Sequence, residues 1–133
     1  MQMEQELVQA ALAARENAYA PYSDFRVGAA LLAENGKIYL GCNVENAAFG
    51  PTNCAERTAV FSAVCDGQRR FRMLAVAGGK NGEAIGACFP CGVCRQVLSE
   101  FCGPDFPVLV VSSDDGAYQK YTLQQLLPFH FTL

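Results

Sequence analysis

Two short segments of the chain carry the residues best suited to chemistry. One is Cys54-Ala55-Glu56 and the other is Pro90-Cys91-Gly92-Val93-Cys94. Three thiolates can hold a zinc ion in tetrahedral geometry and leave the fourth position open to water. A carboxylate two residues from one ligand can move protons to and from that water. The pattern therefore predicts a hydrolytic zinc site, with Cys54, Cys91 and Cys94 as ligands and Glu56 as the general base.

Both segments stand where helices are expected to begin. Cys91 and Cys94 are three positions apart, so at a helix start they share one face and can bind one ion. The N-terminus of a helix also lowers the pKa of a thiol, which favours the thiolates that a metal needs. Three thiolates around a divalent cation leave excess negative charge, which Arg57 and Arg95 could offset.

Other interpretations of the cysteines stay open at this point. Cys91 and Cys94 alone could be a redox pair or two buried thiols. Cys88 lies within reach and could be the fourth ligand of a closed site, in a non-catalytic four-cysteine structural zinc module. Glu56 argues against such a module, because a structural site has no use for a carboxylate beside a ligand. The only histidine, His130, is expected at a surface or interface.

The segments around these residues predict an α/β fold. Hydrophobic periodicity and turn residues alternate helices with strands. The expected helices are 4–18, 54–65, 90–101 and 123–127, and the expected strands are 25–33, 37–44, 73–78, 106–112 and 118–121. Such alternation implies helices on both faces of a sheet, a three-layer α/β/α arrangement. Asn35-Gly36 is a hairpin signal, so the central five-stranded sheet is expected to be mixed. Residues 1–133 are interpreted as one domain.

The composition limits the classes of partner. The chain is 51% apolar and 17% charged, with a formal net charge of −3. An acidic domain without a dense basic cluster binds nucleic acid poorly, because phosphate contacts dominate that affinity. No apolar run approaches the length of a membrane span, and segment 1–6 lacks the pattern of a signal peptide. The chain is therefore expected in the cytoplasm, where clustered cysteines are metal ligands more often than disulfides.

Longer segments around the two motifs are similar to a known family. They are Pro21-Tyr22-Ser23-x-Phe25-x-Val27-Gly28-Ala29-Ala30, Gly41-x-Asn43-Val44-Glu45-Asn46-Ala47, Asn53-Cys54-Ala55-Glu56-Arg57-Thr58-Ala59, Pro90-Cys91-Gly92-x-Cys94-Arg95-Gln96-Val97-Leu98 and Leu126-Leu127-Pro128-x-x-Phe131. The two central motifs match the zinc deaminase signature in its all-cysteine form. Together the segments resemble the small homotetrameric cytidine deaminases of pyrimidine salvage, over nearly the whole chain.

The resemblance implies an enzyme that deaminates cytidine and deoxycytidine to uridine and deoxyuridine and releases ammonia. It implies one zinc ion per subunit, bound by Cys54, Cys91 and Cys94. A zinc-bound hydroxide would attack C4 of the pyrimidine, with Glu56 as the proton shuttle between the water, N3 and the leaving amine. It further implies a homotetramer with its sites at subunit interfaces.

The same resemblance implies how the substrate is held. Asn43 and Glu45 would hydrogen-bond the ribose 3′-hydroxyl, Phe25 would pack against the base, and the backbone of Ala55 would contact the pyrimidine edge. Structural interpretations remain: Phe25 as a core residue, Asn43 as a strand-end residue and Glu45 as a solvated charge. Glu45 near the sugar would repel a phosphate, which favours a nucleoside over a nucleotide. Free cytosine is expected to be a poor substrate, because it leaves the carboxylate unpaired.

Two further residues take roles from the resemblance. Arg57 would hydrogen-bond the zinc thiolates, and Phe131 would reach into a neighbouring subunit's site unless it belongs to its own subunit's core. Phe49 stands where the family often has tyrosine, and Gly50-Pro51 makes the loop distinctive, so subunit contacts there could differ. A deaminase of another cytosine nucleoside, such as an aminoacyl-nucleoside antibiotic, is the alternative enzyme.

Overall fold

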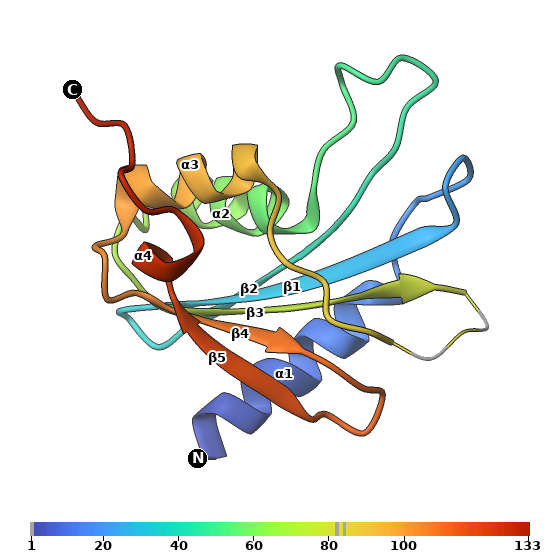
Figure 1. Cartoon of the computed structure of the whole chain (residues 1–133), viewed down its shortest axis with the longest axis horizontal. Helices are drawn as coiled ribbons and strands as arrows, with labels where there is room; N and C mark the ends of the chain where they lie inside the picture. The colour runs from blue at the N-terminus through green and yellow to red at the C-terminus, as the bar shows by residue number, and fades with distance from the viewer. Residues whose placement is uncertain (1, 82, 84) are drawn as a thin grey trace.

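Helices and strands follow one another in the predicted order (Figure 1). The computed structural model describes residues 2–81, 83 and 85–133. The helices are α1 (Gln2–Arg15), α2 (Ala55–Cys65), α3 (Gly92–Phe101) and α4 (Leu123–Leu126). The strands are β1 (Phe25–Ala33), β2 (Ile38–Cys42), β3 (Phe71–Lys80), β4 (Pro107–Val111) and β5 (Tyr118–Thr122). Within these described residues, no helix is long and apolar enough to cross a membrane.

The five strands form one mixed sheet in the order β2-β1-β3-β4-β5. β1 pairs antiparallel with both β2 and β3, β3 pairs parallel with β4, and β4 pairs antiparallel with β5. The Asn35-Gly36 turn joins β1 and β2 as predicted, with Gly36 at a positive φ of 89° that glycine tolerates. The parallel pair needs a crossover connection, and α3 lies within it. The expected mixed five-stranded sheet is therefore confirmed.

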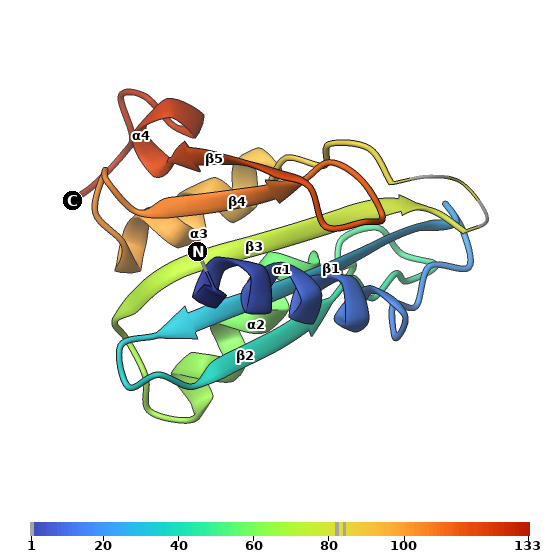
Figure 2. The ribbon, with the colours of Figure 1, turned by 90° about the horizontal axis from the view of Figure 1, so that it is seen from below.

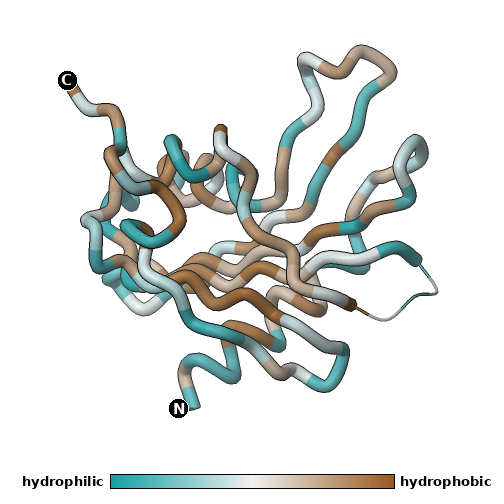
Figure 3. Tube along the Cα trace, in the orientation of Figure 1, coloured by the Kyte–Doolittle hydropathy of each residue, from teal (hydrophilic) through white to brown (hydrophobic). Residues whose placement is uncertain are grey.

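Helices cover both faces of this sheet. Figure 2 shows α1 across one face, with α2 and α3 behind the strands on the other. Successive side chains of a strand point to opposite faces, so Leu31 packs toward α2 and α3 while Leu32 packs toward α1. Apolar segments concentrate in the central strands (Figure 3), which are buried on both sides. This confirms the three-layer α/β/α fold.

Most element boundaries differ from the prediction by one to three residues, and two of the differences lie close together in space, at the end of α1 and at the end of β3. The first helix ends at Arg15 rather than near residue 18, because the backbone N–H groups of residues 16–18 bond to carbonyl groups only three residues back, as in a turn. The side chain of Arg15, the last helical residue, donates to the carbonyl groups of Gly79 and Lys80. The third strand was expected to close at Gly78, yet it continues to Lys80 and pairs there with the start of β1. Gly82 and Ala84, in the expected loop 81–89, lie outside the described residues.

Gly41 lets the first turn of α2 rest directly on β2. A Cβ atom at Gly41 would lie 2.2 Å from the carbonyl oxygen of Ala55 and 2.6 Å from the backbone nitrogen of Ala59. Both atoms belong to the helix backbone, which cannot move aside as a flexible side chain can. The absence of a side chain at Gly41 therefore sets how close the residues at the start of α2 come to the sheet.

Gly41→Ala should lower the free energy of unfolding by about 1–3 kcal/mol, the cost of overpacking a filled interior. Urea denaturation measures this loss. Gly103→Ala is the matched control, because a Cβ atom at Gly103 meets no heavy atom within 4 Å. An equal loss in the two variants would show that the close contact between β2 and α2 is not what makes glycine necessary.

Candidate active site

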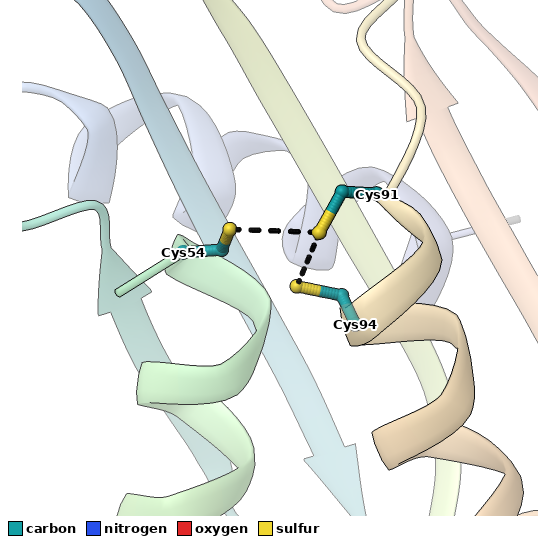
Figure 4. Close-up of side chains that lie close together, drawn as sticks. All are labelled: Cys54, Cys91 and Cys94. Carbon is teal, nitrogen blue, oxygen red and sulfur yellow. Dashed lines mark hydrogen bonds between the residues drawn. The ribbon is translucent and has the colours of Figure 1, made fainter. Parts of the chain in front are cut away.

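The three predicted metal ligands meet where α2 and α3 begin (Figure 4). Cys54 is the N-cap residue of α2, Cys91 is the N-cap residue of α3, and Cys94 lies in the first turn of α3. Their Sγ atoms all lie within 4.8 Å of one another, with 3.7 Å between Cys54 and Cys91 and 3.5 Å between Cys91 and Cys94. Tetrahedral zinc, with Zn–S bonds of about 2.3 Å, holds its sulfur ligands roughly 3.8 Å apart. The cluster therefore fits a zinc ion.

Negative charge is favoured at this cluster. The pKa of Cys54 falls to about 5, because the thiol of Cys94 and the guanidinium of Arg57 hydrogen-bond its thiolate. The Nη2 atom of Arg57 lies 3.2 Å from the Sγ atom of Cys54. The hydrogen bond to Cys54 in turn raises the pKa of Cys94, so one negative charge is shared before a metal binds. A divalent cation would draw the remaining protons off the thiols.

Cys88 is not part of the sulfur cluster. Among the described residues, the group of ligand atoms close enough to share an ion contains Cys54, Cys91 and Cys94. Burial raises the pKa of Cys88 to about 12, so this residue is a neutral thiol at physiological pH. The structure therefore gives no support to a closed four-cysteine zinc module and leaves one coordination position for water or substrate.

Glu56 lies in the first turn of α2, with only 4% of its surface exposed. Burial raises the pKa of its carboxyl group to about 7, and the neighbouring charge of Cys54 adds to that rise. A bound cation would lower this pKa again. A carboxyl group whose proton is easily gained and lost is suited to general acid–base work in a pocket that excludes bulk water.

A pocket of about 230 Å³ opens beside the cluster. Its walls bring together residues from distant parts of the chain: Ser23, Phe25, Val27, Asn43, Glu45, Thr52, Asn53, Cys54, Ala55, Glu56, Cys88, Phe89 and Cys91. Four residues predicted to bind substrate are therefore placed next to two of the ligands and the predicted base. Sequence reasoning assigned no role to five further lining residues, whose types are as common in cores and loops as in binding sites: Ser23, Val27, Thr52, Asn53 and Phe89.

Asn43 and Glu45 are held by hydrogen bonds before any ligand binds. The Oδ1 atom of Asn43 accepts from the backbone N–H of Val27 at 2.8 Å, and its Nδ2 atom donates to the carbonyl oxygen of Phe25 at 2.8 Å. The carboxylate of Glu45 accepts from the Ser23 hydroxyl and from the backbone N–H groups of Tyr22 and Ser23. The Ser23 hydroxyl is the main reason why the pKa of Glu45 is lowered. Each side chain keeps unused hydrogen-bonding capacity.

Phe131 does not line the pocket of its own chain. Its side chain is 68% exposed, and its carbonyl oxygen accepts a hydrogen bond of 3.0 Å from the Nε2 atom of Gln96 on α3. The C-terminal segment is thus attached to α3 while the ring of Phe131 faces outward. The interpretation of Phe131 as a core residue of its own subunit is wrong, and its role in a neighbouring site stays a prediction.

Comparisons with known proteins agree with this geometry. The family model described as "Cytidine and deoxycytidylate deaminase zinc-binding region" matches residues 1–110. The cytidine deaminase of Sporosarcina psychrophila is 53% identical over 119 residues, covering 90% of this chain and 84% of that protein. The cytidine deaminase of Halalkalibacterium halodurans is 45% identical over 128 residues, covering 96% and 93%.

Solved structures give the same result for the fold. The crystal structure of cytidine deaminase from Burkholderia pseudomallei is similar, with a TM-score of 0.85 and 48% sequence identity, covering 95% of this chain and 97% of that chain. The crystal structure of cytidine deaminase from Mycobacterium tuberculosis has a TM-score of 0.80 at 38% identity, covering 96% of each chain.

Proposed function

The chain belongs to the cytidine deaminase family, and from this we propose that it hydrolyses cytidine and deoxycytidine to uridine and deoxyuridine with release of ammonia. The observation that carries the proposal is the meeting of three thiol ligands and one buried carboxyl group in a single pocket. The family's zinc-binding region and the cluster of Cys54, Cys91 and Cys94 support one zinc ion per chain. When bound, zinc acidifies a coordinated water and supplies a hydrolytic nucleophile near neutral pH.

Glu56 moves the protons of this reaction. Its carboxylate takes a proton from the attacking water and delivers it to N3 of the pyrimidine, which makes C4 more electrophilic. The same carboxylate then takes the proton of the hydroxyl group added at C4 and gives it to the amino group, which leaves as ammonia while the C4 carbonyl forms. Its burial in the first turn of α2, two residues from Cys54, places it beside the metal and supports this role.

The remaining pocket residues orient the nucleoside. The ring of Phe25 packs against the base, and Asn43 and Glu45 hydrogen-bond the ribose 3′-hydroxyl. Ala55 is the first residue of α2, so its N–H has no intrahelical partner and can donate to the pyrimidine edge. The hydrogen bonds that already fix Asn43 and Glu45 reduce the entropy lost when substrate binds, which supports their positioning role.

Turnover of five cytosine-bearing compounds tests the proposed function. Cytidine and deoxycytidine should react, which ultraviolet absorbance and ammonia release both report. Cytosine should react at least about 1,000-fold more slowly than cytidine, because it leaves Glu45 without its hydroxyl partner. Cytidine monophosphate should also be poor, since the lowered pKa of Glu45 keeps a negative charge near the sugar. A higher rate on an aminoacyl-nucleoside antibiotic than on cytidine would favour the alternative enzyme.

Arg57 offsets the negative charge of the thiolate cluster, as its contact with Cys54 Sγ supports. Arg57→Ala should weaken zinc binding by about 10- to 100-fold, the usual effect of removing a partner of a metal ligand. Competition with a chromogenic chelator measures this change. Arg69→Ala removes an exposed arginine from the turn after α2 and is the control. Equal zinc affinity in the two variants would remove Arg57 from this role.

In this proposal, the chain assembles as a homotetramer with its sites at subunit interfaces. Large apolar side chains stand exposed on the single chain, including Phe49 at 86% and Phe131 at 68%. The segment between β2 and α2, which carries Phe49, extends away from the sheet (upper right in Figure 1). Sedimentation should give a mass four times that of the 14.3 kDa chain. A monomer with full turnover would contradict both the assembly and the role of Phe131.

A cytoplasmic location is part of the same proposal. All seven cysteines are unpaired, a state that a reducing compartment maintains. Fractionation of the source cells tests this location, and recovery from the exterior would contradict it.

A further inference from the structure

Gly78 on β3 lies directly beneath two side chains of the pocket wall. A Cβ atom at Gly78 would lie 2.8 Å from the Sγ atom of Cys88, 2.9 Å from the Cβ atom of Cys88 and 3.1 Å from the Cε2 atom of Phe25. At the first two distances, Cys88 would have to shift before a Cβ atom could be admitted. The space of one methyl group at Gly78 is therefore shared by the thiol of Cys88 and the ring of Phe25.

The topology puts these residues on the face of the sheet where the pocket opens. Gly78 is paired with Val27 of β1, and Val27 lines the pocket. Phe25 is two positions before Val27, so both side chains point to the same face of β1. Gly78 also forms an isolated bridge with Gly86, just before Cys88. The end of β3, at Gly78, thus lies directly under the part of the pocket lining that contains Phe25 and Cys88.

This end of β3 is fixed from the opposite face. The Nη2 atom of Arg15, on α1, donates to the carbonyl oxygens of Gly79 at 2.8 Å and of Lys80 at 3.2 Å. Arg15 is buried there, so its hydrogen bonds are shielded from water. These hydrogen bonds resist movement of the end of β3 toward α1, so a larger residue at Gly78 should displace Cys88 and Phe25 instead.

Cys88 has no other role in the reaction. It is outside the metal cluster, yet it lines the pocket beside Phe89 and packs against the apolar layer between the sheet and α2. A buried, protonated thiol behaves as a small apolar group. Cys88 therefore contributes its size and its packing against Gly78.

We propose that Gly78 and Cys88 are positioning residues that set the height of the Phe25 ring and so the width of the gap that receives the pyrimidine base. The inference rests on the proposed function, because it needs Phe25 to pack against a base. Dispersion contacts are steep in distance, and a gap of about 0.5–1 Å loses a quarter to a half of the contact energy. Phe25 contacts the base in the ground state and in the transition state alike, so displacing its ring should raise KM and leave kcat almost unchanged.

Gly78→Ala tests the inference. KM for cytidine should rise about tenfold, the usual effect of one misplaced methyl group in an apolar pocket. Calorimetry should show uridine binding weakened by a similar factor, while kcat and zinc content stay near those of the wild type. Gly79→Ala is the matched control on the same strand, because its Cβ atom would point to the opposite face of the sheet. There it would make only ordinary contacts, with Ile85 at 3.4 Å and with the Nη2 atom of Arg15 at 3.6 Å. This control should keep the wild-type KM.

Two variants at Cys88 complete the test. Cys88→Ala introduces no close contact and should raise KM a few-fold, because the ring of Phe25 loses part of its support. Cys88→Gly added to Gly78→Ala should restore much of the lost affinity, since the space taken at one residue is vacated at the other. A wild-type KM in Gly78→Ala, or in Cys88→Ala if Gly78→Ala does not fold, would overturn the inference. The inference would also be overturned if the losses of cytidine affinity caused by the changes at Gly78 and Cys88 simply added in the double variant. No turnover by the zinc-loaded wild type would instead refute the proposed function and the inference with it.

Discussion

Glu56→Gln should lower cytidine turnover by about 10,000-fold or more, while zinc stays bound. Glutamine keeps the shape of the side chain but cannot carry a proton. Each of the two proton transfers assigned to Glu56 contributes about 100- to 10,000-fold in enzymes of this kind. The other carboxylate that lines the pocket, Glu45, is engaged by the Ser23 hydroxyl and two backbone N–H groups and cannot take over. Steady-state kinetics and zinc analysis of the same sample measure the result.

Glu34→Gln is the control for this prediction. Glu34 is exposed in the turn between β1 and β2, and the substitution removes the same charge far from the pocket. It should keep wild-type turnover. If Glu56→Gln retained zinc and turned over cytidine within tenfold of the wild type, Glu56 would not be the proton shuttle.

Cys91→Ala should abolish both zinc binding and turnover. Two thiols would remain for an ion that needs at least three protein ligands in catalytic sites. The loss of zinc affinity should exceed about 100-fold, the largest effect expected from a residue that only supports a ligand. Metal analysis after dialysis against a weak chelator measures occupancy, and cytidine kinetics on the same sample measure activity.

Two other cysteines serve as controls for Cys91→Ala. Cys65 is exposed at the end of α2, so Cys65→Ala should keep both zinc and activity. Cys88→Ser should keep its zinc, whatever its effect on KM, because Cys88 lies outside the sulfur cluster. Loss of zinc from Cys88→Ser would instead establish the four-cysteine module.

The metal ligands were predictable because their signals are local. Cys91 and Cys94 share one face of a helix start through their spacing alone, and Pro90 marks that start. Cys54 required one further step, namely that two helix N-termini lie side by side on the same face of the sheet. The alternation of helices with strands predicts helices on both faces of the sheet but not which helices share a face, so the motif match indicated Cys54 and the structure places it with the other two thiols.

The role of Gly78 could not be predicted, because it depends on contacts between distant residues. Gly78-Gly79 is a typical strand terminator in sequence, but β3 runs on through both residues to Lys80. The same holds for Cys88, whose spacing from Cys91 suggested a ligand while its side chain packs against Gly78. Arg15 likewise hydrogen-bonds the carbonyl group of a residue more than sixty positions away along the chain.

The motifs suggested which residues contact the substrate, but not the hydrogen bonds that hold those residues in place. Asn43 is fixed by the backbone of β1, at Val27 and Phe25, and no local pattern reveals such a pairing. Ser23 precedes β1 and appeared only as part of a motif, although its hydroxyl and N–H groups hold Glu45. Side-chain to backbone hydrogen bonds between separate loops form only once the sheet has assembled.

Cytidine turnover by one preparation, measured with zinc, after chelation and after zinc is restored, tests the proposed function most directly. The zinc-loaded protein should convert cytidine to uridine with one ammonia released per nucleoside. Chelation should abolish the reaction, and added zinc should bring it back. No turnover by the zinc-loaded protein, or equal turnover after the metal has been removed, would contradict a zinc-dependent cytidine deaminase.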